Sequence, residues 1–364
     1  MALLIIIFFS HFFIGQILES TKIKGINYAF NLMLLFLVFY FTLGITDSAD
    51  LPMYEFAYGK QRNDFDPMFV FLNSIMKTNG FTFLEFFKFH LIVYTLTYFF
   101  FITRYTKNYF YVFLVFIVLY YVPYVNQIRY YMAFPFFLLA LHYFLTTRNW
   151  FLFILFTFLA LITHSAILIL YLFIPMFYFL STKNFFLVTF ISAFAFLAIV
   201  LLLFQLGILQ QLEHFGEYFG KGNTGSLSGG FFNSLPYFVY LSFLWFIDKK
   251  YKKNNSDYAL DRNYRFLSKL SFFTIIFIPA SFITQVLGHR YVFPFLIIWI
   301  IYYMYMIRNQ SKQQKLFSFL LFALVHIVAG FCIYILPNIV FGESSFEYEL
   351  EKSLKSIEYI DFIF

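Results

Sequence analysis

Residues 185–206 read FFLVTFISAFAFLAIVLLLFQL and contain no charged side chain. One α-helix needs about 20 apolar residues to cross a bilayer core, so this stretch has the length and composition of a transmembrane span. The whole chain is similar, because 62% of its 364 residues are hydrophobic and only 12% are charged. Its mean hydropathy is +0.77. A water-soluble domain of this size cannot bury so much apolar surface, so the sequence predicts an all-α polytopic integral membrane protein.

Apolar runs recur along the chain, whereas the short alternating segments of a membrane β-barrel are absent. We predict about twelve transmembrane helices, at residues 2–18, 26–45, 86–103, 108–125, 128–146, 150–163, 166–180, 185–206, 234–247, 266–285, 291–307 and 316–336. The segment 68–84 is interrupted by the polar run NSIMKTNG and is predicted to be a re-entrant or interfacial helix. We expect one transmembrane domain over residues 1–336 and an extracytoplasmic tail over residues 337–364.

The distribution of Lys and Arg sets the predicted orientation, because these residues are enriched in the cytoplasmic loops of membrane proteins. With the N-terminus outside, the inside loops hold 16 of the 25 basic residues and 4 of the 18 acidic residues. The net charge is then about +12 inside and about −5 outside. The reverse orientation inverts this difference, so we predict that both termini are extracytoplasmic. Because the positive charge follows the topology, it does not indicate binding to nucleic acid.

Residues 121–140, YVPYVNQIRYYMAFPFFLLA, place a polar cluster inside an oily run. The cluster contains Asn126, Gln127 and Arg129, at the predicted extracytoplasmic start of a span. Polar groups at membrane depth are costly and generally mark function. Asn126 lies three residues before Arg129, so it is expected to share its helix face and to cap the helix. Arg129 is interpreted either as a ligand for an anion or as a residue that snorkels to lipid headgroups; its polar neighbours favour the first interpretation.

A second arginine, Arg290, follows Gly288 and His289 before the predicted span 291–307. The predicted topology puts it at the same membrane level as Arg129. Guanidinium groups match phosphate oxygens in bidentate geometry, and helix N-termini add positive potential. We therefore predict a pyrophosphate site formed by Asn126, Gln127, Arg129, His289 and Arg290.

Several segments together resemble the Wzy-type polysaccharide repeat-unit polymerases of bacteria, specifically their EpsG-like branch. These segments are DLPMY at 50–54, DP at 66–67, NQIR at 126–129, THSAILIL at 163–170 and GHRY at 288–291. The resemblance covers roughly residues 40–180, with a weaker match near 285–300. The family more often has Glu at the position of Asp66, and Gly where this chain has Met68.

This resemblance implies that the growing glycan is transferred from undecaprenyl pyrophosphate to a new lipid-linked repeat unit. The reaction is expected at the outer face of the bacterial inner membrane, with O-antigen, capsule or exopolysaccharide as the product. Donor and acceptor are both lipid-linked oligosaccharides in the membrane lipid. Chain-length regulator and flippase proteins of the same pathway are expected partners, and neither a nucleotide nor a metal cofactor is expected.

The acceptor hydroxyl must lose a proton, so the implied reaction needs a general base. The candidates, in order, are Asp50, Asp66 and His164. A lone histidine in a turn, such as His164, is more often a structural polar residue than a base. The weaker candidates for contact with the glycan are Asp47, Tyr54 and Tyr130. The acidic residues of the first outer loop match no metal-binding signature, so no metal site is predicted.

Three other functions are compatible with parts of the pattern. An O-antigen ligase is expected to carry one large outer domain, but the longest predicted outer loop has about 27 residues. A membrane acyltransferase is expected to have a His or Asp constellation on its cytoplasmic face, which the predicted topology lacks. A flippase or transporter of lipid-linked oligosaccharide is expected to show charges through the mid-membrane region and related halves; here the charges gather at one face.

Overall fold

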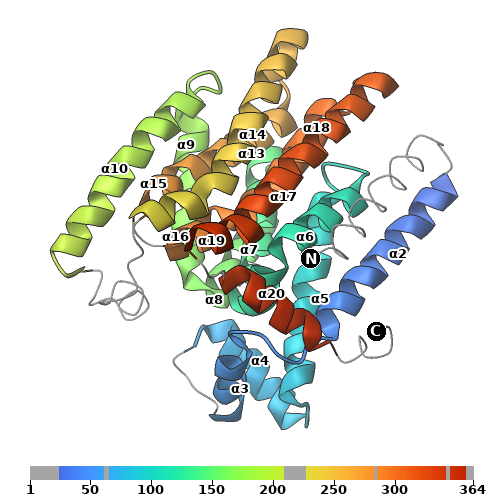
Figure 1. Cartoon of the computed structure of the whole chain (residues 1–364), viewed down its shortest axis with the longest axis vertical. Coiled ribbons are helices and arrows are strands. Elements are labelled where there is room, and N and C mark those ends of the chain that lie inside the picture. The colour runs from blue at the N-terminus through green and yellow to red at the C-terminus, as the bar shows by residue number, and fades with distance from the viewer. Residues whose placement is uncertain (1–23, 61–64, 209–226, 283–284, 342–344, 358–364) are drawn as a thin grey trace. The chain divides into compact units, whose positions relative to one another are not determined.

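The computed structural model describes residues 24–60, 65–208, 227–282, 285–341 and 345–357 (Figure 1). Within these ranges the chain is helical and contains no β-strand. The predicted all-α class is therefore confirmed. The predicted first span, residues 2–18, lies outside the described residues.

Five helices of the described residues are long and apolar enough to cross a membrane. They are Phe83–Ile102, Ile128–Thr147, Phe185–Gln205, Gly230–Asn254 and Gln313–Ile335. Shorter apolar helices accompany them at Asn31–Leu43, Val115–Asn126, Trp150–Thr163, Ser165–Phe179 and Phe293–Ile307. These helices confirm a multi-pass membrane protein, while the count of twelve spans and the orientation stay predictions.

The described helices belong to two compact units, one within residues 1–171 and 345–364 and the other within residues 172–344. The helices of the first unit are α2 (Lys24–Leu43), α3 (Leu51–Lys60), α4 (Pro67–Thr78), α5 (Phe83–Ile102), α6 (Tyr109–Asn126), α7 (Ile128–His142), the π-helix η1 (Tyr143–Thr147), α8 (Trp150–Thr163) and α20 (Ser345–Lys355). The 3-10 helix η2 (Ser165–Leu172) follows α8, and all of its residues except Leu172 belong to this unit. The predicted single domain over residues 1–336 and the extracytoplasmic tail stay predictions.

The second unit contains helices of very different length. They are α9 (Phe173–Phe179), α10 (Phe185–Gln205), α13 (Leu227–Asn254), η3 (Ser256–Ala259), α14 (Arg262–Phe273), η4 (Thr274–Phe277), α15 (Ile278–Ser281), α16 (Gln285–Tyr291), η5 (Phe293–Phe295), α17 (Leu296–Ile307), α18 (Lys312–Gly330), η6 (Phe331–Ile335) and α19 (Leu336–Phe341). Helices α13 and α18 run side by side (Figure 1).

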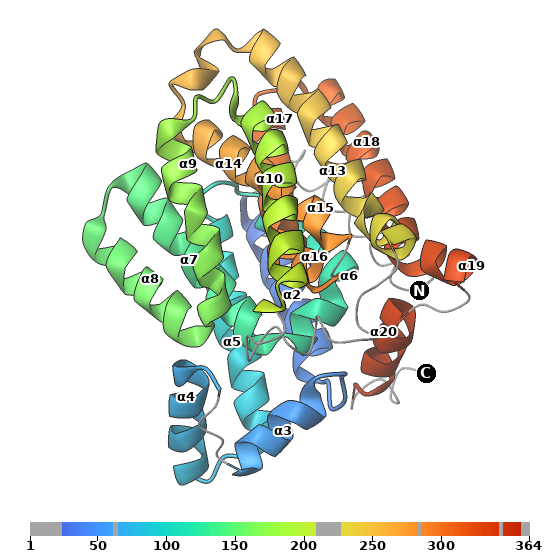
Figure 2. The same cartoon turned by 90° about the vertical axis from the view of Figure 1, so that its left-hand side faces the viewer.

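Helix α7 is the centre of the first unit. Every residue of α7 except Arg129 is buried, and the helix packs mainly against α8 and α5 (Figure 2). Ala133 and Ala140 are fully buried, and small residues of this kind let membrane helices approach closely. Arg129 is therefore the one charged residue of a helix that is otherwise enclosed by apolar packing.

Helices α3 and α4 lie beside the start of α5 (Figure 2). A turn joins α4 to α5, and Gly80 adopts a positive φ of 79° there, which suits a residue without a Cβ. The Tyr58 hydroxyl donates to the Phe81 carbonyl over 2.6 Å, and Lys77 Nζ donates to the Gly59 carbonyl over 2.7 Å. These bonds connect α3 to the turn and to the end of α4. The segment 68–84 thus forms a short helix and a turn, and its re-entrant or interfacial placement stays a prediction.

The C-terminal helix α20 docks on the loop that connects α2 to α3. The Thr46 hydroxyl donates to the Ser356 carbonyl over 2.7 Å, and Lys352 Nζ lies 3.2 Å from Asp47 Oδ1. Leu350 and Ile357 are buried. The docked helix therefore holds the segment that leads into α3.

Candidate functional site

The break between α6 and α7 falls at Gln127. Helix α6 ends at Asn126, and Gln127 is the N-cap of α7, with φ −97° and ψ 56° and no side-chain capping bond. The Tyr94 hydroxyl donates to the Tyr124 carbonyl over 2.5 Å, near the end of α6. The predicted capping of α7 by Asn126 is wrong, because the chain leaves helical geometry one residue later. Asn126 and Arg129 therefore belong to different helices, so the expectation that they share one helix face is also wrong.

Asp66 is the N-cap residue of α4, and Pro67 follows it at the first helical position. This order is typical of a helix start, since proline has no N–H to leave unpaired there. The Asp66 carboxylate, however, makes no capping bond to its own helix. It is directed to side chains and backbone of distant segments instead.

Asp66, Arg129 and His164 form one hydrogen-bonded cluster in the first unit. Arg129 Nη1 donates to Asp66 Oδ2 over 2.7 Å, and His164 Nδ1 lies 2.9 Å from the same oxygen. The Ser165 backbone N–H donates to Asp66 Oδ1 over 3.3 Å. The side chain of Asp66 is 8% exposed, against 20% for Arg129 and 12% for His164. The fold therefore joins residues that are distant in the sequence around one nearly buried carboxylate.

The environment of Asp66 keeps its carboxylate ionised. Burial alone raises the pKa of this group, but the hydrogen bond from His164 and the charges of His164 and Arg129 outweigh it, so the pKa lies below its ordinary value. An ionised carboxylate only accepts hydrogen bonds, so the Nδ1 nitrogen of His164 is the donor in this contact. The Nε2 nitrogen is then the one that carries the lone pair when the ring is neutral.

The backbone presents His164 to Asp66 at the end of a helix. His164 is the C-cap residue of α8, with an extended conformation (φ −161°, ψ 108°), and its N–H donates to the Ala160 carbonyl. Ser165 begins the following 3-10 helix η2. Because the chain changes direction between α8 and η2, the imidazole and the next N–H both reach the same carboxylate.

Aromatic rings surround the cluster. The Arg129 Cζ atom lies 4.5 Å from the ring centroid of Phe65 and 5.7 Å from that of Tyr54. The ring of Tyr130 packs edge-to-face on His164, with centroids 5.7 Å apart. Tyr54 and Tyr130 therefore lie at the cluster, and their contact with a glycan stays a prediction. Sequence reasoning missed Phe65, whose signal was its place next to Asp66, and the backbone N–H of Ser165.

Asp47, Asp50, His289 and Arg290 belong to other segments of the chain. Asp50 precedes α3, where its carbonyl accepts a bond from the Tyr54 N–H over 3.2 Å. Asp47 is paired with Lys352. His289 and Arg290 belong to α16 in the second unit. The predicted pyrophosphate site that combines them with Arg129 stays a prediction.

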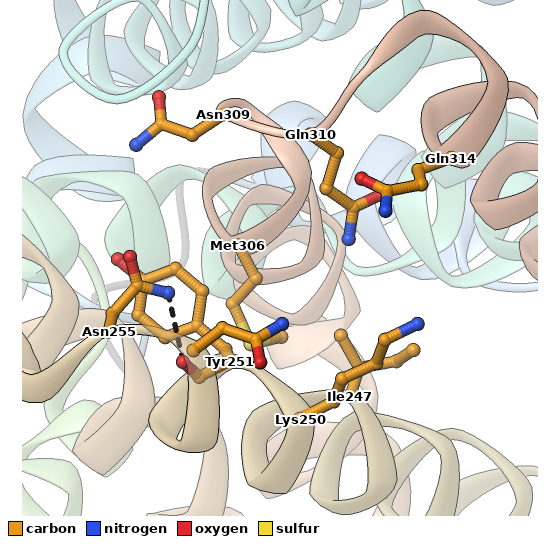
Figure 3. Close-up of a pocket in the computed structure, with 9 residues that line it drawn as sticks. Ile247, Lys250, Tyr251, Asn255, Met306, Asn309, Gln310 and Gln314 are labelled. Atoms are coloured by element: carbon orange, nitrogen blue, oxygen red, sulfur yellow. Dashed lines mark hydrogen bonds between the residues drawn. The ribbon is translucent and has the colours of Figure 1, made fainter.

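Two described cavities differ from the cluster in chemistry. An apolar groove of about 420 Å³ lies on α4 and α5, with Glu85 and Lys88 in its lining. A cavity of about 200 Å³ in the second unit is lined mainly by carboxamides, together with Lys250 and Tyr251 (Figure 3). No His, Asp or Glu is among the described residues that line this second cavity. Of these three places, the Asp66 cluster is the one that combines a carboxylate, an imidazole and a guanidinium.

Comparison with known proteins identifies one family. The model of the EpsG family matches residues 27–349, which include Asp66, Arg129 and His164. Neither the curated proteins nor the solved structures gave a match. The family match confirms the resemblance that the sequence motifs indicated.

Proposed function

Because the chain belongs to the EpsG family, we propose that it joins lipid-linked oligosaccharides into a longer polysaccharide through Asp66, Arg129 and His164. The family indicates a role in polysaccharide polymerisation in general, and the apolar helices make the chain a multi-pass membrane protein. One observation supports the assignment to these residues. Arg129 Nη1 and His164 Nδ1 lie 2.7 and 2.9 Å from the same carboxylate oxygen, Asp66 Oδ2.

In the proposed reaction the growing glycan leaves undecaprenyl pyrophosphate and bonds to a hydroxyl oxygen of a new lipid-linked repeat unit. The C–O bond between the anomeric carbon and the pyrophosphate breaks, and its electron pair stays on the pyrophosphate oxygen. The acceptor hydroxyl forms the new C–O bond and loses its proton. No nucleotide is consumed, because the lipid carrier already supplies the activated leaving group.

Arg129 is the proposed ligand of the departing pyrophosphate. A guanidinium group binds phosphate oxygens through charge-assisted and often bidentate hydrogen bonds. Its positive charge stabilises the negative charge that develops on the leaving group as the C–O bond breaks. The side chain is positioned for this task by Asp66 and by the ring of Phe65.

His164 is the proposed general base. A carboxylate that accepts a bond from Nδ1 fixes the tautomer, so that Nε2 is the nitrogen that takes a proton, as in the hydrolases that use a carboxylate–histidine pair. Asp66 is then a positioning residue, because it acts through His164 and Arg129. Asp50 remains the alternative base, since it stands at the start of the helix that carries Tyr54.

The proposal is tested in a strain that lacks the gene and is complemented with single variants. Wild-type protein should restore a ladder of glycan lengths on a gel, whereas His164→Gln should give a single repeat unit. His142→Gln is the matched control, because His142 is the last residue of α7 and its Nδ1 nitrogen contacts the Tyr105 hydroxyl over 2.6 Å. With equal amounts of protein in the membrane, a normal ladder from His164→Gln contradicts the proposal. Loss of all surface glycan in the deletion strain, including the single unit, would indicate a flippase instead.

A further inference from the structure

Three buried polar atoms without a hydrogen-bond partner lie at the break between α6 and α7. They are Oδ1 of Asn126, Oε1 of Gln127 and Nε of Arg129, and none of them has a partner among the described residues. Asn126 is only 7% exposed. A buried polar atom without a partner costs about 1–3 kcal/mol, so proteins seldom keep several together without a use for them.

The hydrogen-bonding character of these atoms restricts what they can bind. Two are carbonyl oxygens, which only accept, and one is an N–H, which only donates. Ionised phosphate oxygens only accept as well, so a pyrophosphate can satisfy Arg129 Nε but neither carboxamide oxygen. A hydroxyl group donates one hydrogen bond and accepts others. Neighbouring hydroxyls on a sugar ring can therefore satisfy all three atoms.

The position of these atoms connects them to the proposed reaction. Arg129 Nη1 is already used by Asp66, so Nε is a separate donor on the same guanidinium. Asn126 and Gln127 come directly before α7, whose second residue is Arg129. A sugar attached to a pyrophosphate that is held by Arg129 would therefore have its hydroxyls next to the break.

We propose that Asn126 and Gln127 accept hydrogen bonds from hydroxyl groups of the donor sugar that is attached to the pyrophosphate. The inference rests on the proposed function and defines how that site recognises its substrate. It differs from the sequence-based prediction, which assigned both carboxamides to the pyrophosphate. On this assignment Arg129 binds the leaving group, and Asn126 and Gln127 distinguish one donor sugar from another.

The test uses the full-length protein in lipid nanodiscs and two separate probes. One probe is inorganic pyrophosphate, and the other is the free oligosaccharide repeat unit released from the host's surface glycan by mild acid. Asn126→Leu and Gln127→Leu should each weaken oligosaccharide binding about tenfold, the effect of one lost hydrogen bond of about 1.4 kcal/mol. Both should leave pyrophosphate binding unchanged. Asn126→Asp and Gln127→Glu keep the acceptor oxygens and should bind the oligosaccharide within about threefold of wild type.

Asn73→Leu is the matched control, because Asn73 is a buried asparagine of α4 whose Oδ1 also has no partner among the described residues, while its amide group donates to the Ala57 carbonyl. It should leave the binding of both probes unchanged. Thermal unfolding shows whether each variant is folded, and Gln127→Leu keeps the test valid if Asn126→Leu is not, because Gln127 is less buried than Asn126.

Loss of pyrophosphate binding in both Asn126→Leu and Asn126→Asp overturns the inference, because the carboxamide would then hold the diphosphate through its NH₂ group. Unchanged oligosaccharide binding in all four variants, or no oligosaccharide binding by the wild type, overturns it too. A wild type that binds the oligosaccharide but no pyrophosphate contradicts the proposed function instead.

Discussion

At the scale of single residues, the central feature is that Arg129 and His164 share one oxygen of Asp66. The sequence pointed to each of these residues, but not to their pairing. Asp66 and Arg129 are separated by more than 60 positions, and neither helical periodicity nor composition carries information about such a contact. Arg129 was expected to bind an anion, and the anion that it contacts in the structure is the protein's own carboxylate.

Replacing Arg129 by lysine separates the two interpretations of this residue. We expect Arg129→Lys to lower the polymerisation rate by about tenfold or more, because lysine keeps the charge but loses the bidentate geometry. A residue that only anchors the helix to lipid headgroups would tolerate lysine. The rate is measured as polymer formed per unit time by purified protein. Arg104→Lys is the control, because Arg104 is exposed and stacks on Phe100; equal rates for both variants contradict the assignment.

The lowered pKa of Asp66 predicts a defined dependence of stability on pH. The pKa of Asp66 in the folded protein lies below its unfolded value of about 3.9. The interactions of the Asp66 carboxylate therefore stabilise the fold fully at pH values above about 3.9. The stabilisation is lost as the pH falls through the folded pKa. Wild type should therefore unfold at a higher temperature than Asp66→Asn at pH 6, and the two should converge on acidification. A difference in unfolding temperature that grows towards low pH contradicts this assignment.

At the scale of helices, the sequence predicted the bounds of uninterrupted apolar helices well. It did not predict that some helices continue through polar residues beyond their apolar part. The spans predicted at 150–163 and 185–206 correspond to α8 and α10 almost to the residue, because their ends coincide with polar caps such as Asn149. The span predicted at 234–247 is shorter than α13 (Leu227–Asn254), because the helix continues through charged residues after its apolar part. The span predicted at 266–285 is divided into α14, η4 and α15.

The docking of α20 predicts which of its contacts matter most. Leu350→Ala should lower the free energy of unfolding by about 2–5 kcal/mol, because Leu350 is 4% exposed and its truncation leaves a cavity. Lys352→Ala should cost less than about 1 kcal/mol, because its ion pair with Asp47 is largely exposed. Denaturant unfolding of both variants measures the difference. If the lysine variant is the less stable of the two, the ion pair and not the apolar face holds the helix.

At the scale of the whole molecule, composition alone predicted an all-helical multi-pass membrane protein, because so apolar a chain has no water-soluble alternative. The motifs also indicated the family that the comparison identifies. The grouping of α20 with the first 171 residues was not predictable, since it depends on contacts between the two ends of the chain. Orientation rests on the charge distribution, which is a property of the loops and not of the helix packing.

The predicted orientation can be measured with single cysteines in a Cys332→Ser background. Lys60→Cys lies in the predicted outer region and Ser256→Cys in the predicted cytoplasmic loop, and both positions are exposed. In intact cells a membrane-impermeant maleimide should label position 60 and not position 256, whereas both should react after the membrane is opened. Labelling of position 256 alone in intact cells would show the reverse orientation.

The measurement closest to the central claim is the rate of glycan transfer by purified protein in nanodiscs supplied with lipid-linked repeat units. Polymer length and released undecaprenyl pyrophosphate are followed together for wild type, His164→Gln and Asp66→Asn. We expect both variants to bind the lipid-linked substrate and to form polymer about 10²–10⁴-fold more slowly, the usual effect of losing a general base or the residue that orients it. Polymer formation and pyrophosphate release at the wild-type rate in both variants would contradict the assignment of the cluster as the catalytic site.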